Sequence, residues 1–408
     1  MFTKKKSAKL RKDVYILCFG IMVTMMGNMV YPMLTIILQQ KFSMSATNIA
    51  LILAADSISL FIASFLGGRI ADKYNRKWNI IICDLFTVVM YGLCFILPLS
   101  YLSIVLIIFG GSFQQMEIAS YNTLITEMTD EENRDRGFSV FYLCFNIGAF
   151  ISTAAAGFLI NEYTKLVFLL DGAGVFVSTI IIMLFVKYKR TAKTEEEAEE
   201  AKGMGFSVFK NTPLLLLFLV IMCLNEIVHN EYSYLIPMEL DRILAENGAK
   251  VFGTLISVSC VIVVFMTTPI TNLLHKKEHL HKLQLSNIFQ IAGYAVFGIG
   301  IILYNIPLFY VGFIIYIFGE ICDAISYEPY LMHITPERYR GRIDGIFSMT
   351  MKIAVMLFNL IVGTTYDRSP VIAWSVLMVT GVMAIVLTKV LKHKEKTMVL
   401  QVQKNKRK

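Results

Sequence analysis

The chain is poor in charged residues and rich in apolar ones. Only 17% of its 408 residues are charged, 56% are hydrophobic, and the mean hydropathy is +0.62. Soluble globular domains carry about 25% charged residues, so this composition excludes an ordinary soluble protein. The apolar residues gather in runs, and a helix of about 20 apolar residues crosses a hydrocarbon core of about 30 Å. The runs lack the polar–apolar alternation of membrane β-strands. The sequence therefore predicts an all-α polytopic membrane protein.

Motifs for catalysis, nucleotide binding and metal binding are also missing. The sequence has no Gly-x-x-x-x-Gly-Lys-[Ser/Thr], no Gly-x-Ser-x-Gly and no His-Glu-x-x-His, which argues against ATP hydrolysis and against an enzyme. Seven cysteines are scattered without a Cys-x-x-Cys pair, so we expect buried thiols. We interpret the histidines 275, 279 and 281 as part of a basic connection. Neither a metal nor an organic cofactor is expected.

Twelve apolar segments are long enough to span a bilayer. Their predicted bounds are 14–38, 46–70, 78–98, 101–126, 138–160, 165–187, 213–236, 250–274, 283–303, 307–332, 343–366 and 370–391. The longest connection, which contains the charged run KTEEEAEEAK, separates the spans into two groups of six. We therefore predict an N-terminal six-helix bundle (1–187), a cytoplasmic linker (188–212), a C-terminal six-helix bundle (213–391) and a basic cytoplasmic tail (392–408).

Lysine and arginine are distributed asymmetrically about these spans. They outnumber the acidic residues by 38 to 30 and give a net charge of +8. If both termini are cytoplasmic, as an even number of spans requires, most of the basic residues fall on the cytoplasmic side. The charge then needs no nucleic-acid partner, and the tail QVQKNKRK would lie near anionic lipid headgroups. We predict a monomeric multi-pass protein of the plasma membrane, and the short connections suggest a bacterial source.

Two segments half a chain apart match along one ungapped shift. The segments are SYNTLITEMTDEENRDR (120–136) and SYEPYLMHITPERYRGR (326–342), and the shift pairs Ser120 with Ser326 and Arg136 with Arg342. Agreement at several positions along one shift indicates an internal duplication, which relates the two halves of many transporters.

A short charged segment, GGRIADKYNRK (67–77), connects the second and third predicted spans. We expect Gly68 to let two helices approach closely, because it has no side chain to hold them apart. Asp72 can accept hydrogen bonds from the N-terminal amides of the next helix, where the helix dipole favours an anion. Arg76 can pair with the carboxylate of Glu127 at a neighbouring helix end.

Two groups of six spans with this charged segment between spans 2 and 3 resemble the major facilitator superfamily. The signature Gly-x-x-x-Asp-[Arg/Lys]-x-Gly-[Arg/Lys]-[Arg/Lys] is matched except that Asn75 replaces its second glycine, and we expect Asn75 to tolerate a left-handed turn. The resemblance implies two pseudo-symmetric six-helix bundles with the major facilitator fold that rock about a central cavity. It also implies a cytoplasmic gate formed by Gly68, Asp72, Lys73, Arg76, Lys77 and Glu127.

Acidic residues outnumber basic ones inside the predicted spans. An ionisable group at mid-bilayer costs at least about 2.5 kcal/mol, so each one needs a partner or a function. Lys352 is the only mid-span cation, and it cannot neutralise all of the acids. Some of them must therefore bind protons or cations. The predicted proton-coupling residues are Glu320, Asp323, Glu226, His229, Glu231 and Glu117. The simpler alternative is that Lys352 pairs with Glu320 or Asp323 and only stabilises the C-terminal half.

The stretch FGEICDAISYEP (318–329) resembles the span-10 Gly-Glu element of the lactococcal multidrug pump and its relatives, and this implies a proton-linked or drug-linked acid at Glu320. The acid that those relatives place early in span 5 and the Gly-Pro kink of antiporters are both absent. Polar and aromatic residues in other spans could line the cavity, and we predict that Asn28, Tyr31, Gln114, Gln115, Tyr232 and Tyr327 bind the substrate.

Three functions stay open at this point. The first is drug:proton antiport, the proton-coupled efflux of amphipathic, often cationic small molecules, with the proton gradient in place of a cofactor. The second is proton-linked uptake of a nutrient such as a peptide, sugar or organic acid, although the acidic and arginine motif of peptide transporters is absent from span 1. The third is a transporter-like sensor that binds a small molecule without moving it.

Overall fold

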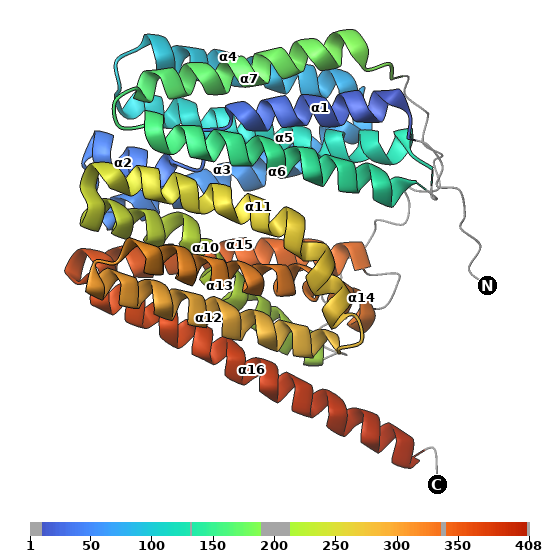
Figure 1. The fold of residues 1–408 in the computed structure, drawn as a ribbon. Coiled ribbons are helices and arrows are strands. Elements are labelled where there is room, and N and C mark those ends of the chain that lie inside the picture. The colour runs from blue at the N-terminus through green and yellow to red at the C-terminus, as the bar shows by residue number, and fades with distance from the viewer. Residues whose placement is uncertain (1–9, 131–132, 189–212, 336–339, 406–408) are drawn as a thin grey trace. The chain divides into compact units, whose positions relative to one another are not determined.

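The computed structural model describes residues 10–130, 133–188, 213–335 and 340–405, and within these ranges the regular structure is entirely helical. The elements, drawn in Figure 1, are α1 (Lys12–Gly27), α2 (Leu34–Phe42), α3 (Ala46–Lys73), α4 (Arg76–Ile96), α5 (Tyr101–Met128), α6 (Arg134–Leu159), α7 (Thr164–Phe185), α10 (Pro213–Leu244), η1 (Ala245–Asn247), α11 (Gly248–Leu274), α12 (His279–Leu303), α13 (Ile306–Ala324), α14 (Tyr327–Ile334), α15 (Arg340–Arg368) and α16 (Pro370–Asn405).

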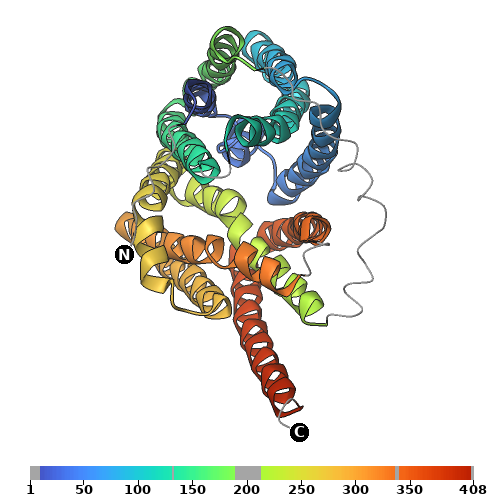
Figure 2. The ribbon, with the colours of Figure 1, turned by 90° about the vertical axis from the view of Figure 1, so that its right-hand side faces the viewer.

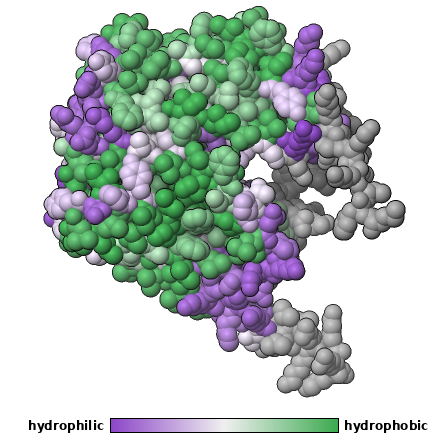
Figure 3. Space-filling view, viewed as in Figure 1, coloured by the Kyte–Doolittle hydropathy of each residue, from purple (hydrophilic) through white to green (hydrophobic). Residues whose placement is uncertain are grey.

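Ten segments of the described chain are long and apolar enough to cross a membrane. One of them, Leu214–Leu274, has 61 residues and contains both α10 and α11, whereas α1 and α2 are too short to qualify. Hydrophobic side chains cover most of the face seen in Figure 3, as contact with lipid requires. The all-α multi-pass class is therefore confirmed, while the count of twelve spans stays a prediction.

The described helices form two compact units. Unit 1 takes its residues from Met1–Met44, Ala55–Lys193 and Pro237–Val264, and unit 2 takes the remainder. As a result α3, α10 and α11 each supply residues to both units. The predicted linker lies outside the described residues from position 189 onward.

In unit 1, α1 packs against α6 and α7, and α4 packs against α5 and α7. An apolar cluster that includes Leu17 on α1 and Ile125 on α5 is fully buried between these helices. The α6–α11 crossing is close because two glycines meet there: a Cβ on Gly253 would lie 2.9 Å from the Cα of Gly157. Small residues allow such backbone contact in membrane helices.

The first predicted span, 14–38, is interrupted, which corrects the expectation of one continuous helix. α1 ends at Gly27, and α2 begins only at Leu34. The backbone amides of Met29 and Val30 instead donate to the Asp171 carboxylate of α7, at 3.2 and 3.1 Å. Pro32 has no amide hydrogen with which to continue the helix.

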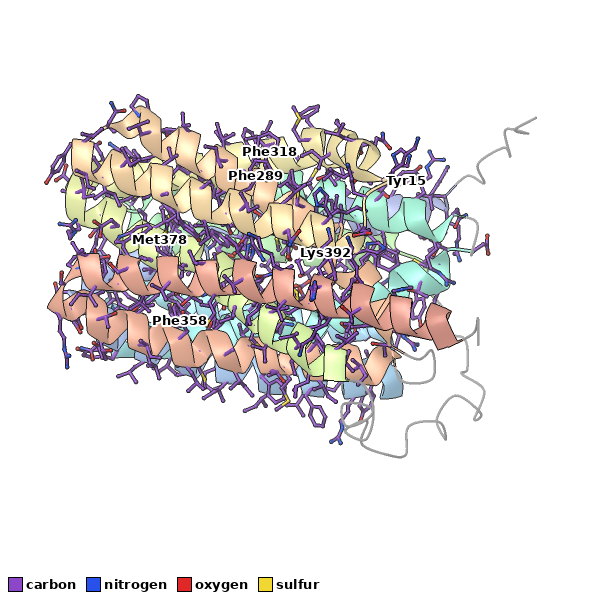
Figure 4. The ribbon with its side chains drawn as sticks, turned by 90° about the horizontal axis from the view of Figure 1, so that it is seen from below. Tyr15, Phe289, Phe318, Phe358, Met378 and Lys392 are labelled. Atoms are coloured by element: carbon purple, nitrogen blue, oxygen red, sulfur yellow. The ribbon has the colours of Figure 1, made fainter. Side chains whose placement is uncertain are left out.

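Unit 2 is built around α12, which packs against α13 and α16 (Figure 2). Phe289 of α12 and Phe318 of α13 lie side by side with ring centroids 6.4 Å apart (Figure 4). The tenth predicted span, 307–332, is also divided, since α13 ends at Ala324 and α14 begins at Tyr327. At this break the Ser326 hydroxyl donates back to the Cys322 carbonyl at 2.7 Å.

The last helix of unit 2 is longer than its predicted span. α16 begins at Pro370, as the sequence predicts, but continues through the predicted tail to Asn405. Lys392, labelled in Figure 4, forms an ion pair with Glu278 at 3.3 Å between Nζ and Oε2. The extra turns of α16 thus carry charged residues.

Candidate functional site

Four of the predicted proton-coupling residues gather in unit 2. Glu226 and His229 stand on one face of α10, three residues apart, and Glu320 and Asp323 stand in the same way on α13. Asp323 interacts electrostatically with the other three. These residues and Tyr316 are called the α10–α13 cluster below.

Hydrogen bonds and ring contacts organise this cluster. The Tyr316 hydroxyl lies 2.7 Å from His229 Nδ1, and the two rings stack with their planes 15° apart. Tyr232 also packs against the imidazole, with ring centroids 5.3 Å apart, and its ring lies 6.3 Å from that of Tyr316. Aromatic faces beside carboxylates form a site that attracts cations and planar apolar groups.

The cluster holds more carboxyl groups than cations. Asn225 hydrogen-bonds to Asp323, yet the buried Oδ1 of that carboxyl has no hydrogen-bond partner in the described part of the chain. Lys352 is exposed on α15 and forms no ion pair with any described residue, so its predicted pairing with Glu320 or Asp323 is absent here. A buried carboxyl oxygen without a donor is stabilised when a proton or a cation binds to it.

Glu231 lies deeper in unit 2 than the cluster and is 0% exposed. With its amide nitrogen turned toward Glu231, Asn359 of α15 donates to Oε1 at 3.3 Å. The other oxygen, Oε2, has no partner among the described residues. Glu231 therefore has one unpartnered carboxyl oxygen and one neighbour, Asn359, that the sequence did not indicate.

The remaining candidates are dispersed. Tyr327 packs on Phe218 in an apolar cluster of unit 2. In unit 1, Tyr31 donates to Asp56, while Asn28 Oδ1 and Gln114 Nε2 are buried without a partner among the described residues. The other unit 1 candidates are Gln115, which is half-buried on α5, and Glu117, which is buried on the same helix.

The charged segment of unit 1 ends in a buried network. Arg76 is 0% exposed and pairs with Glu127 at 3.1 Å, and the Tyr188 hydroxyl connects the two, 3.0 Å from Arg76 Nη1 and 2.6 Å from Glu127 Oε2. Lys77 donates to the carbonyls of Met183 and Val186 near the end of α7. The expected Arg76–Glu127 pair is present, and Tyr188 is a partner that the sequence did not indicate.

Two expectations for this segment are wrong in detail. A Cβ on Gly68 would meet nothing within 4 Å, whereas one on Gly67 would overlap the Met116 carbonyl oxygen. Gly67 is therefore the residue of close approach. Asn75 is not left-handed: its φ is −70°, and its side chain caps α4 by accepting from the amide of Lys77 at 3.1 Å. The side chains of Asp72 and Lys73 lie outside the described residues.

A second network in unit 2 joins helix ends from distant parts of the sequence. Asp367, in the last turn of α15, accepts from the backbone amides of Ala46 and Thr47 at 2.8 and 2.9 Å and from the Thr47 hydroxyl. Tyr234 of α10 donates to the Ala46 carbonyl at 2.7 Å. The carboxylate thus caps the N-terminus of α3, where unsatisfied amides and the helix dipole favour a negative charge.

Within the described residues, no group of three or more His, Cys, Asp or Glu side chains is arranged to hold a metal ion. The fold and these networks define a multi-pass helical membrane protein with ionisable groups buried inside its helical bundles. This is the organisation of a membrane transporter.

Comparisons with known proteins identify the family. The sequence profile of the Major Facilitator Superfamily matches residues 16–359, and the chain belongs to this superfamily. It is 24% identical to the uncharacterized MFS-type transporter YqjV of Bacillus subtilis over 331 residues, which cover 80% of this chain and 79% of that protein. It is also 24% identical to the quinolone resistance protein NorA of Staphylococcus aureus over 260 residues, 61% of this chain and 66% of NorA.

Solved structures agree on the fold. A crystal structure of a peptide transporter POT in complex with sulfate superposes with a TM-score of 0.77 at 15% identity, covering 97% of this chain and 99% of that one. A crystal structure of the nucleoside transporter NupG gives 0.75 at 14% identity, with 93% and 98% coverage. The chain is a transporter and not an enzyme.

Proposed function

We propose that this protein is a drug:proton antiporter that exports amphipathic, often cationic small molecules. The observation that carries the proposal is the α10–α13 cluster, in which three carboxyl groups meet one imidazole that stacks on Tyr316 and packs against Tyr232. A carboxyl group that binds a proton in one state and a cationic substrate in another couples the two flows. The similarity to a quinolone resistance protein supports this substrate class.

The proposed architecture is the one predicted from the sequence: twelve spans in two six-helix bundles, with both termini in the cytoplasm of a bacterial cell. The protein works as a monomer and needs no cofactor besides the proton gradient.

The Arg76–Glu127–Tyr188 network, with Gly68, Asp72, Lys73 and Lys77, belongs to the cytoplasmic gate. Proton coupling rests on Glu226, His229, Glu320 and Asp323, with Glu231 and Glu117 as further titrating groups. The substrate contacts Tyr232 and Tyr327 in the C-terminal half and the polar residues Asn28, Tyr31, Gln114 and Gln115 in the N-terminal half.

The test is gradient-driven transport in proteoliposomes. Purified protein is reconstituted, a pH gradient is imposed, and the fluxes of a panel of lipophilic cations and of protons are recorded for wild type and for Glu226→Gln and Glu320→Gln. We expect both substitutions to abolish uphill flux while downhill exchange continues. Unchanged uphill flux in both variants would remove these two residues from the coupling mechanism.

The same vesicles separate the rival functions. Proton-linked nutrient uptake predicts that substrate and protons move in the same direction, and it predicts flux of a peptide, sugar or organic acid rather than of lipophilic cations. A sensor that no longer transports predicts binding of a ligand with no flux under any gradient.

A further inference from the structure

We propose that Asp84 and Glu117 bind one shared proton, at a site in unit 1 distinct from the acids of α10 and α13. Asp84 stands on α4 and Glu117 on α5, and the side chains are 0% and 3% exposed. This inference deepens the titrating role that the proposed function gives Glu117 by naming its partner, and it holds for any substrate or transport direction because it concerns equilibrium proton binding.

The two carboxyl groups are neighbours. Their side chains interact with each other, and the Thr179 hydroxyl of α7 donates to Asp84 Oδ2 at 2.8 Å. The remaining oxygens, Asp84 Oδ1 and Glu117 Oε2, are buried and find no donor among the described residues. Each carboxyl thus keeps one buried acceptor oxygen without a donor among the described residues.

Two ionised carboxylates would leave both of these oxygens unsatisfied. A carboxylate only accepts hydrogen bonds, so neither group can donate to the orphaned oxygen of the other unless one of them carries a proton. One proton converts the pair to –COOH···⁻OOC–, with a net charge of −1, and it supplies the donor that the orphaned oxygens lack. Two neighbouring negative charges that are buried away from water also repel each other, which favours a proton on one of them.

The surroundings offer no competing cation. Neither carboxyl forms an ion pair with a described lysine, arginine or histidine. The titratable groups that face the pair are Cys83 on α4 and Tyr121 on α5. Both groups are neutral near pH 7, since cysteine and tyrosine ordinarily lose their protons at about 8.5 and 10. α7 contributes only the neutral hydroxyl of Thr179.

Infrared difference spectroscopy of the full-length protein in lipid nanodiscs tests the proposal. The intensity of the carbonyl stretch of protonated carboxyl groups at pH 7 is compared between wild type and Asp84→Asn, Glu117→Gln and the double variant. Each amide supplies a donor to the remaining carboxylate, so each single variant should lose the band of one protonated carboxyl. The double variant should lose no more than either single variant.

Two outcomes would overturn the proposal. No loss in the double variant means that both carboxyls are ionised at pH 7, and loss of the band of two protonated carboxyls in the double variant means that each held its own proton. Asp130→Asn, at an exposed position, is the matched control and should leave the band unchanged. Because the two single variants measure the same proton independently, the result stands if one of them fails to fold.

Discussion

Gly67 and Gly68 are adjacent in α3 yet have different surroundings. A Cβ on Gly67 would lie 2.7 Å from the Cα of Met116 in α5, whereas one on Gly68 would meet nothing within 4 Å. The signature of the superfamily draws attention to Gly68, but the packing of this structure depends on Gly67. The same substitution, glycine to alanine, at both positions therefore separates two contributions to stability: the packing of α3 against α5 and the helix preference of the backbone.

We expect Gly67→Ala to lower the thermal unfolding temperature in detergent, at a cost of about 1–3 kcal/mol for forcing two backbones apart. Gly68→Ala should be neutral, or more stable by up to about 1 kcal/mol, because alanine favours the helix over glycine. The measurement is thermal unfolding of both variants beside wild type. Equal shifts in the two variants would contradict the close approach at Gly67.

The hydroxyl of Tyr188 leads to a prediction of how the stability of the folded protein depends on pH. It follows the end of α7, outside the spans, and burial, together with the neighbouring Glu127 carboxylate, raises the pKa of its hydroxyl. The folded protein therefore keeps a proton that the unfolded chain loses near the ordinary tyrosine pKa of about 10. The stability contributed by this hydroxyl is complete below pH 10 and declines as the pH rises through the raised pKa.

The matching substitution is Tyr188→Phe, which removes the hydroxyl between Arg76 and Glu127. At pH 7 the variant should unfold at a lower denaturant concentration than wild type, and this difference should shrink above pH 10. Denaturant midpoints of the two proteins from pH 7 to 11 provide the measurement. A difference that stays constant over the whole range would show that Tyr188 does not titrate in this way.

At this scale the sequence identifies charged residues better than their partners. An acid inside an apolar run is conspicuous, and so Glu226, Glu320 and Asp323 could be found. Tyr188, Tyr316 and Asn359 are neutral residues of kinds that occur throughout membrane helices, and only the packing of separate helices assigns them a role. Asp367 was missed because it stands at a span end beside Arg368, where a polar residue needs no explanation.

At the scale of elements, the interrupted first span depends on one carboxylate. Asp171 accepts from the amides of Met29 and Val30, which have no helical partners, and it is itself 0% exposed. Replacing its side chain by the methyl group of alanine leaves two buried amides without an acceptor. Each unsatisfied buried group costs about 1–3 kcal/mol.

Asp171→Ala should therefore lower stability by several kcal/mol, and it should speed hydrogen exchange at the amides of residues 29 and 30. Asp171→Asn keeps one acceptor oxygen of similar shape and should lose much less. Thermal unfolding and hydrogen exchange read by mass spectrometry test both variants. Exchange at residues 29 and 30 that is as slow in the alanine variant as in wild type would contradict the assigned role.

The sequence could not predict this interruption, because hydropathy measures how apolar a segment is and not whether its backbone is helical. Residues 14–38 are apolar throughout, and the break depends on an acceptor more than a hundred positions away. The second break, at Ser326, escapes notice for the same reason. The start of α16 was better predicted, because Pro370 fixes it through local chemistry.

At the scale of the whole molecule, the class of fold follows from composition, because only helical bundles and closed barrels satisfy the backbone inside a membrane. The internal repeat and the charged segment identified the superfamily. The sequence could not predict which residues belong to each compact unit, because tertiary contacts place one part of α3, of α10 and of α11 in unit 1 and the other part in unit 2. The number of spans depends on such contacts too.

Alternating access gives a prediction at this scale. In the proposed two-bundle architecture, Thr47 belongs to the N-terminal bundle and Asp367 to the C-terminal bundle, and both lie on the outer side. We therefore expect the cap of Asp367 on α3 to open in each transport cycle, although both residues belong to unit 2 in this structure. In a background without the seven native cysteines, a disulfide between Thr47→Cys and Asp367→Cys should abolish substrate flux in proteoliposomes, and reduction should restore it. Flux that continues while the disulfide is intact would contradict an obligatory opening at this point.

The length of α16 has a practical consequence. Its 36 residues extend about 54 Å at about 1.5 Å per residue, while the hydrocarbon layer measures only about 30 Å. The surplus forms a stiff stalk that reaches into water beyond the lipid. A fluorescent reporter fused to the carboxyl end of this helix would lie outside the membrane and away from the transport site. We expect such a fusion to report localisation and expression in living cells without disturbing activity.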